Sequence, residues 1–387
     1  MRAQSGGTAQ QQSDRDESRA DWMELFFDLV FVALIGQLST GLREHTSFGA
    51  ALVFLALFAS VWWSWVNLTY TINVQLGLSR RALAGYMLTA MAAVGAVAIA
   101  APEAVGDRAW LFALGNAGLR CVMLALWARR TWAVSAGSRA RILAYNGATA
   151  LLWFASALVP APACYALWAV AILCEIALLL ASAHGMLSRV QTFRVEHLAD
   201  RFGTLVIIAL GESVLAIVVA LSAAFTAQAA IVAGLSLVIA ACLAWVMFMY
   251  GIDSMRSGLE RLVAAGDSKG IIGTFAFLPY FLVAGVMLLS GALAIAIREP
   301  QQVLPAVSAL SLSGGIVLFY AANTLIGLRY GLRRRFVLAW AVPSLLLPLA
   351  VLPLALGVAA GWAVAAMAAI LVGLVIQAEW LGRHRTE

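Results

Sequence analysis

The chain has 387 residues, of which 63% are hydrophobic and only 11% are charged. Soluble domains carry about 25% charged and roughly 45–50% apolar residues, so this composition excludes a soluble globular protein. The formal charge of +6 does not indicate a partner nucleic acid, because the basic residues lie in short clusters between apolar segments. We therefore expect an all-α integral membrane protein whose partner is the lipid bilayer.

Charged, proline and glycine residues divide the sequence into apolar segments of the length that crosses a bilayer, about 20 residues. The first six expected helices cover Trp22–Leu42, Phe48–Leu76, Ala82–Ala101, Ala109–Ala128, Ile142–Val159 and Ala163–Met186. The second six cover Phe202–Ser222, Ala229–Gly251, Ile272–Ile297, Val303–Leu328, Phe336–Leu356 and Val358–Leu381. About twelve transmembrane helices are predicted. They follow a polar segment, residues 1–21, that we expect to be a disordered cytoplasmic tail.

The basic residues indicate the orientation of these helices. Nearly all of the 25 Lys and Arg residues lie in the termini and the even-numbered loops. The odd-numbered loops contain Arg43, Arg108 and Arg298. Because Lys and Arg concentrate on the cytoplasmic side of membrane proteins, both termini are predicted to be cytoplasmic.

Two segments of the chain repeat each other's pattern. Trp65-Val66 precedes an aromatic residue at 70, as Trp245-Val246 precedes one at 250, and Trp-Ala-Val-Ala begins at both 168 and 362. We expect two parallel six-helix repeats related by an axis along the membrane normal. The predicted divisions are a first half at 22–186, a cytoplasmic linker at 187–201, a second half at 202–381 and a cytoplasmic C-terminal tail at 382–387.

Two strings carry a resemblance to a known family. One is Trp22-Met-Glu-Leu-Phe-Phe-Asp-Leu-Val-Phe-Val, and the other runs from His197-Leu-Ala-Asp-Arg-Phe-Gly to Ile207-Ile-Ala-Leu-Gly-Glu-Ser-Val-Leu-Ala-Ile. Both resemble the hallmark segments of the bacterial low temperature requirement A family. The resemblance implies a multi-pass protein of the bacterial cytoplasmic (inner) membrane. The family's name records a growth phenotype, so the resemblance implies no particular activity.

Ionisable residues inside apolar helices are the candidates for function, since they are costly in hydrocarbon and often mark a substrate or proton path. At a rise of 1.5 Å per residue, Glu212 lies about 15 Å, Arg120 about 17 Å and Glu175 about 18 Å into their helices. Arg120 is expected to form an ion pair with Glu175, as a structural clamp or as part of a binding site. Glu212, between Gly211 and Ser213, is expected to bind a proton or substrate, with Ser213 as a further hydrogen-bonding group.

Three other positions are candidates at the cytoplasmic ends of the helices. Glu24 and Asp28 are four residues apart and so share one helix face, where they either cap the helix N-terminus or bind a proton or substrate. His197 could begin a proton relay or could simply be solvated. The tryptophans at 62, 63 and 65 are expected to form an aromatic belt at the membrane interface rather than a substrate path.

Missing motifs limit the function further. The sequence has no phosphate-binding GxxxxGK[ST] loop, and its only lysine is Lys269, so an ATP-driven pump and a Schiff-base retinal protein are excluded. The four cysteines show no metal-ligand spacing, and no metal or cofactor is expected. The leading hypothesis is a secondary transporter of an unknown small molecule or ion, which could be coupled to protons. The alternatives are a membrane-embedded enzyme acting on a lipid or polyprenyl substrate, and a channel or sensor. The sequence does not predict the oligomeric state.

Overall fold

The computed structural model describes residues 23–41, 47–73, 79–130, 136–186 and 195–383. The expected N-terminal tail at 1–21, residues 187–194 of the expected linker and residues 384–387 of the expected C-terminal tail lie outside these ranges. The chain divides into two compact units. Unit 1 comprises the described residues of Met1–Gln37 and Trp63–Leu178, and unit 2 those of Leu38–Trp62 and Leu179–Glu387.

The described residues are helical almost throughout. Unit 1 contains most of the helix Met23–Gly41, the second half of α2 (Phe48–Asn73), α3 (Arg80–Ala100), the 3-10 turn η1 (Ala101–Glu103), α4 (Ala109–Arg130), α5 (Ala136–Ser156) and most of α6 (Ala163–Met186). Unit 2 contains the first half of α2, α7 (Val195–Ala223), α8 (Ala227–Val246), η4 (Met247–Gly251), α9 (Ile252–Ala264), α10 (Ser268–Ile272), η5 (Gly273–Phe277), α11 (Leu278–Arg298), α12 (Ala306–Arg329), α13 (Arg334–Gly357) and α14 (Ala360–Arg383).

The all-α prediction is confirmed, and the prediction of about twelve transmembrane helices is confirmed for ten of them. When α8 to α9 and α10 to α11 are each counted as one continuous helix, the described residues form twelve. Ten of these are long and apolar enough to cross a membrane. In α6 the apolar part is the shorter Ala163–Ala177, and α5, which carries Arg139 and Arg141, is outside the ten. The chain is therefore a multi-pass membrane protein.

Several helices extend beyond their expected ends. The expected helix Phe202–Ser222 begins at Val195, and the expected helix Ala229–Gly251 continues through the π-helical turn η4 to Ala264. Both expected boundaries lie close to charged residues, but a charge ends a membrane crossing without breaking the backbone hydrogen bonds of a helix. After α9 the chain turns at Gly266, whose φ of 68° favours glycine.

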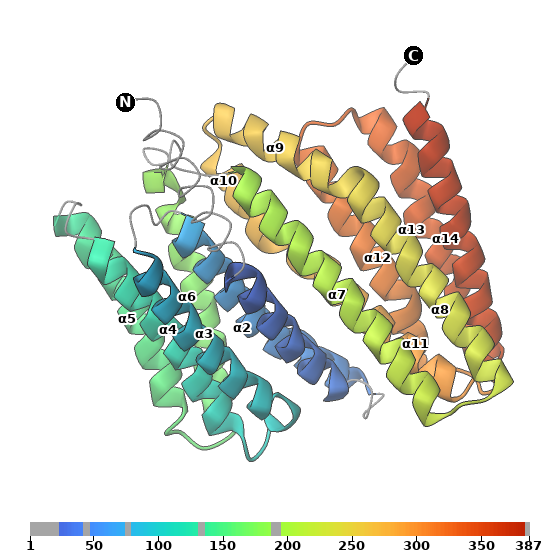
Figure 1. Ribbon diagram of the computed structural model, residues 1–387, viewed down its shortest axis with the longest axis horizontal. Helices are drawn as coiled ribbons and strands as arrows, with labels where there is room; N and C mark the ends of the chain where they lie inside the picture. The colour runs from blue at the N-terminus through green and yellow to red at the C-terminus, as the bar shows by residue number, and fades with distance from the viewer. Residues whose placement is uncertain (1–22, 42–46, 74–78, 131–135, 187–194, 384–387) are drawn as a thin grey trace, which may run out of the picture. The chain divides into compact units, whose positions relative to one another are not determined.

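In unit 1, α4 lies between α3 and α5 and packs on both (Figure 1). A Cβ atom on Gly115 of α4 would lie 2.9 Å from the carbonyl oxygen of Ala93 and 3.0 Å from the backbone nitrogen of Val97, both on α3. Small residues at such crossings let two backbones approach closely, which is the main source of packing between helices in a membrane. The glycine therefore fixes where α3 and α4 meet.

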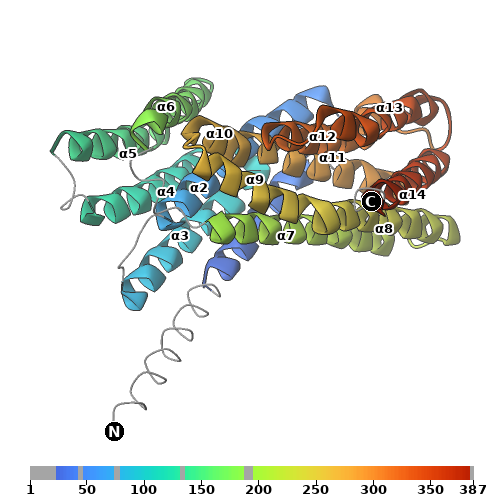
Figure 2. The same ribbon diagram turned by 90° about the horizontal axis from the view of Figure 1, so that it is seen from above.

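In unit 2, α11 is the central helix. It packs on α12, α7 and α8 (Figure 2), and most of its side chains are buried. Its crossing with α12 is made by one glycine from each helix, because a Cβ on Gly285 would collide with the carbonyl oxygen of Gly315 and a Cβ on Gly315 with that of Gly285. This pair is the tightest helix crossing described in unit 2.

In two helices of unit 2 whose regular hydrogen bonding is interrupted, a backbone carbonyl accepts a hydrogen bond from a side chain of another helix. Pro343 in α13 has no N–H for the carbonyl of Ala339, four residues earlier, and the side-chain amide of Gln377 on α14 donates to that carbonyl at 3.0 Å. At the π-helical turn η5, the carbonyl of Ala276 accepts the indole N–H of Trp62 at 2.7 Å. Each bond satisfies a backbone group in a helix whose regular hydrogen bonding is broken.

Candidate functional site

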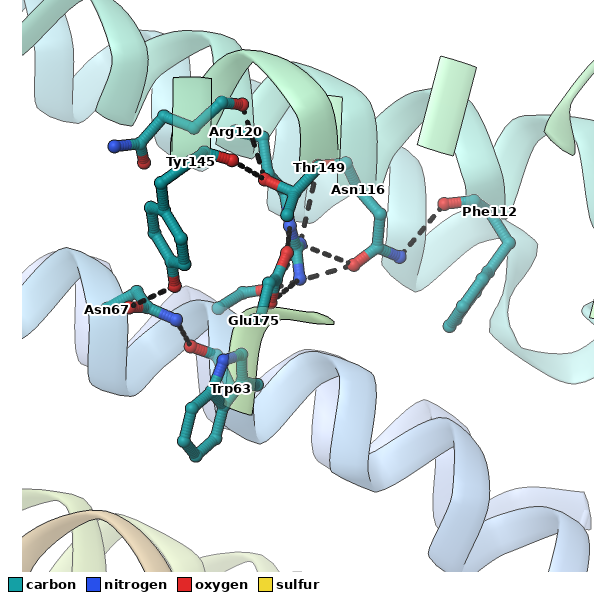
Figure 3. Close-up of polar contacts among 10 residues, drawn as sticks. Trp63, Asn67, Phe112, Asn116, Arg120, Tyr145, Thr149 and Glu175 are labelled. Atoms are coloured by element: carbon teal, nitrogen blue, oxygen red, sulfur yellow. Dashed lines mark hydrogen bonds and ion pairs between the residues drawn. The ribbon is translucent and has the colours of Figure 1, made fainter. Parts of the chain in front are cut away.

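Unit 1 encloses a buried ion pair between α4 and α6. Arg120 and Glu175 are each 1% exposed. The Nε atom of Arg120 donates to Oε1 of Glu175 at 2.7 Å, and its Nη2 donates to Oε2 at 3.0 Å (Figure 3). Such two-point pairs are stronger and more directional than single contacts. The ion pair predicted from the depth of the two residues is thereby confirmed.

The remaining nitrogen of Arg120 is held by uncharged groups. Its Nη1 donates to the hydroxyl of Ser64 at 2.5 Å and to the side-chain oxygen of Asn116 at 2.9 Å. The ring of Trp153 on α5 covers the guanidinium, with its centroid 5.1 Å from Cζ. Helices α2, α4 and α5 thus hold the arginine side chain independently of its bond to Glu175.

A chain of uncharged hydrogen bonds flanks the ion pair (Figure 3). The hydroxyl of Tyr145 on α5 donates to the side-chain oxygen of Asn67 on α2 at 3.3 Å, and the Asn67 amide donates to the carbonyl of Trp63 at 2.9 Å. One turn along α5, the hydroxyl of Thr149 donates back to the carbonyl of Tyr145 at 3.1 Å. The bond between Tyr145 and Asn67 connects α5 to α2 beside the ion pair.

A second buried carboxyl group, that of Asp28, is hydrogen-bonded to the α2 residue that follows Ser64. Asp28 is 1% exposed, and its Oδ1 accepts the indole N–H of Trp65 at 2.8 Å. Trp65 directly follows Ser64, which binds Arg120. Glu24, one turn before Asp28, is also buried. Consecutive residues of α2 therefore bind the Asp28 carboxyl group and the Arg120 guanidinium.

The other candidates lie on α7, in unit 2. Glu212 and His197 are partly buried. Ser213 is buried and its hydroxyl donates to the carbonyl of Ala209 at 3.3 Å, a bond that stays within its own helix. Of the seven candidates, the structure thus joins Arg120 and Glu175 directly.

The prediction of an interfacial aromatic belt is wrong for the tryptophans at 62, 63 and 65. They are 2%, 3% and 0% exposed, respectively. Trp62 and Trp65 donate to protein oxygen atoms, as described above. Tryptophan combines a large apolar surface with one N–H donor, and that combination suits a buried site with an acceptor as well as a membrane interface.

Sequence reasoning missed three residues that contact Arg120, namely Ser64, Asn116 and Trp153, and also Tyr145, which lies beside the ion pair. Their spacing carried a signal. Asn116 precedes Arg120 by four residues, and Tyr145, Thr149 and Trp153 are also four apart, so each set shares one helix face. Polar residues repeating on one face of an apolar helix indicate the side that avoids lipid.

The chemistry available here is the binding of protons and of charged or hydrogen-bonding solutes. Three acidic groups, those of Glu24, Asp28 and Glu175, and the guanidinium of Arg120 are buried within unit 1. Among the described residues, no group of three or more His, Cys, Asp or Glu side chains could hold a metal ion.

Comparison with known proteins gives a family match. Residues 19–376 match the family described as Bacterial low temperature requirement A protein, which confirms the resemblance. The chain is also 28% identical over 321 residues to an uncharacterized protein of Rhizobium meliloti (strain 1021), a match that covers 80% of this chain and 77% of that relative. No solved structure matches the chain.

Proposed function

The chain belongs to the bacterial low temperature requirement A family, and we propose that it is a proton-coupled secondary transporter of a small solute. The proposal depends on one observation. Arg120, Glu175 and their uncharged partners form a buried polar cluster inside a unit built of apolar helices. Charged residues within membrane helices usually serve a substrate or ion path.

Stability alone gives little reason to bury these charges. Replacing a buried ion pair by apolar residues of similar volume is often neutral or stabilising, because taking two charges out of water costs several kcal/mol per ion. An ion pair that also has two hydrogen-bond partners, Ser64 and Asn116, and a covering Trp153 ring is more readily understood as a site that changes its charge state during a transport cycle.

We assign the proton-binding role to Glu175 and Asp28 in unit 1 and to Glu212 in unit 2. Glu24 and His197 would connect these groups to the cytoplasm, and Ser213 would add a hydrogen-bonding group beside Glu212. Both termini in the cytoplasm and two parallel six-helix repeats belong to the same proposal. The concentration of basic residues in alternate loops supports the orientation, and the matching sequence patterns of the two halves support the repeats.

Reconstitution of the purified protein into proteoliposomes that contain a pH-sensitive dye tests this function. Monocarboxylates, amino acids, sugars and monovalent cations are added outside in turn. We expect at least one class to drive a saturable proton flux that the Glu175→Gln variant lacks. Glu103→Gln, which removes an exposed carboxylate from the Arg108–Glu103 pair of the same unit, is the matched control and should leave the flux unchanged.

Two results would replace this function by its rivals. A chemically altered lipid or polyprenyl product recovered from the liposomes would identify an enzyme. An ion current that grows in proportion to concentration, without saturation, would identify a channel. Absence of solute-driven proton flux for every class would exclude proton-coupled transport of those solutes.

A further inference from the structure

We propose that Arg120 binds the carboxylate of a small organic acid in the position that the Glu175 carboxylate holds in this structure. The inference rests on the proposed function and specifies its substrate class. Glu175 then acts as an internal competitor, which leaves Arg120 when it takes up a proton and returns when the acid dissociates. Contacts within unit 1 support this exchange in four steps.

The first step is that Arg120 is prepared for an anion before any anion binds. Ser64, Asn116 and the ring of Trp153 hold the guanidinium from three sides, and none of them carries a charge. The two remaining donors, Nε and Nη2, point to the two oxygens of one carboxylate. A guanidinium fixed in this way presents the planar fork that matches a carboxylate.

The second step is that Glu175 and Arg120 lie on different helices, α6 and α4. Helix α4 packs closely on both α3 and α5. Near its start, α6 is tied to α5 by the indole of Trp168, which donates to the hydroxyl of Ser156 at 3.0 Å. Glu175 lies two turns beyond that tie, so its side chain can turn away from Arg120 without breaking the Trp168–Ser156 bond.

The third step concerns the surroundings of the fork, which suit an acid with an apolar body. Trp153, Trp168 and Phe112 form a continuous aromatic wall, with ring centroids 5.0 to 6.4 Å apart. The indole N–H of Trp153 is buried, and the described residues provide no acceptor for it. Buried N–H groups are nearly always bonded. A second polar atom on the body of the acid, outside its carboxylate, would satisfy this donor.

The fourth step is the proton. Two carboxylates on one guanidinium repel each other, so the acid displaces Glu175 only when the Glu175 carboxylate has become a neutral carboxyl group. Among the described residues, Arg120 on α4 bonds to this carboxylate and Tyr145 on α5 lies close enough to interact with its charge. Helix α2 contributes the neutral side chains of Ser64 and Asn67 in that direction, and Asp28 is bonded to Trp65. One proton is therefore taken up with each acid anion.

Binding is measured on the purified full-length protein with benzoate as the probe, and with acetate, phosphate and chloride for comparison. Tryptophan fluorescence reports binding, and a weakly buffered solution with a pH indicator reports proton uptake. We expect benzoate to bind more tightly than acetate and to take up one proton per molecule bound. Its affinity should fall about tenfold per unit rise in pH wherever Glu175 is ionised.

Variants of the pair assign the proton. Glu175→Gln should bind benzoate more tightly, without proton uptake and without the pH dependence. The double variant Arg120→Gln/Glu175→Gln, which leaves no buried charge unpaired, should not bind benzoate. Arg108→Gln, in the exposed pair with Glu103, is the control and should match the wild type.

Three results would overturn the inference. They are equal affinity for benzoate in the double variant, proton uptake that persists in Glu175→Gln, and phosphate or chloride binding as tightly as benzoate. These outcomes are separable from failure of the proposed function. Proton flux driven by a sugar or a cation would preserve proton-coupled transport and overturn the substrate class. Benzoate–proton binding without flux in liposomes would preserve the site and overturn transport.

Discussion

The indole nitrogen of Trp65 lies 2.8 Å from Oδ1 of Asp28, and the two side chains are 0% and 1% exposed. The aspartate comes from the first membrane helix and the tryptophan from α2. An indole N–H only donates, so this bond requires an acceptor at position 28 but not a charge. The role of Asp28 in stability can therefore be separated from its role as a proton-binding group.

Replacement of Asp28 by Asn and by Leu makes this separation. Asn keeps an acceptor oxygen, so the Asn variant should unfold near the wild-type temperature in detergent. Leu leaves the Trp65 N–H unpaired and should cost about 1–3 kcal/mol. If both variants unfold at the same temperature, the bond to Trp65 does not stabilise the protein. Loss of proton flux in the stable Asn variant would assign the charge of Asp28 to transport.

Removal of Arg120 should be strongly destabilising. Arg120→Ala leaves the Glu175 carboxylate buried and unpaired, at a cost of about 3–5 kcal/mol. Glu175→Gln in the same chain should restore part of that loss, because it removes the unpaired charge. The measurement is chemical or thermal unfolding of the purified variants. A double variant no more stable than Arg120→Ala would contradict this account.

The exposed pair of the same unit provides the control for that experiment. Arg108 and Glu103 lie 3.2 Å apart, with side chains 44% and 49% exposed. Exposed ion pairs contribute about 0–1 kcal/mol, so Arg108→Ala should change the unfolding free energy little.

Neighbouring glycines of α12 allow a matched test of the helix crossing in unit 2. A Cβ on Gly315 would strike the α11 backbone, whereas a Cβ on Gly314 would meet no atom within 4 Å. Gly315→Ala should cost about 1–3 kcal/mol through overpacking. Gly314→Ala should be neutral or slightly stabilising, because alanine favours helix. Equal stability of the two variants would show that the crossing can relax at no cost.

Glu212 is expected to serve transport rather than folding. Gln keeps the shape of the side chain and removes its charge, so Glu212→Gln should fold at wild-type levels and lose pH-dependent flux. Thermal stability and proteoliposome flux are compared on one preparation. Loss of stability with retained specific flux would indicate a structural carboxylate, and full flux at normal stability would leave Asp28 and Glu175 as the proton-binding groups.

Reporter fusions test the proposed orientation. Cytoplasmic signals are expected after Arg81, Arg130, Arg201, Lys269 and Arg335. Signals from the opposite side are expected near His45, Asp107 and Glu299. The physical basis is the retention of Lys and Arg in cytoplasmic loops. One reversed site in either group would contradict the twelve-crossing arrangement.

Much of the fold could be predicted because a bilayer imposes a simple rule, about 20 apolar residues per crossing. Helix α12 follows Pro305 and ends at Arg329, close to its expected range. The Arg120–Glu175 pair was predictable because two opposite charges at one depth in apolar helices have few other partners.

What could not be predicted depends on contacts between distant segments. Nothing local distinguishes an interfacial tryptophan from one whose N–H meets a buried oxygen, so the burial of Trp62 and Trp65 required the fold. The continuation of the chain from α8 into α9 was missed because polarity ends a membrane crossing and not a helix. Trp153 was missed because its neighbour Arg120 is remote in sequence.

The bond from Gln377 to the carbonyl of Ala339 has a consequence for biogenesis. The two residues are 38 positions apart, and the glutamine is synthesised after the whole of α13. While α13 leaves the ribosome and enters the membrane, the carbonyl that faces Pro343 has no donor from α14. Lateral release of α13 into lipid is therefore least favourable before α14 arrives, which favours insertion of the two helices as a hairpin.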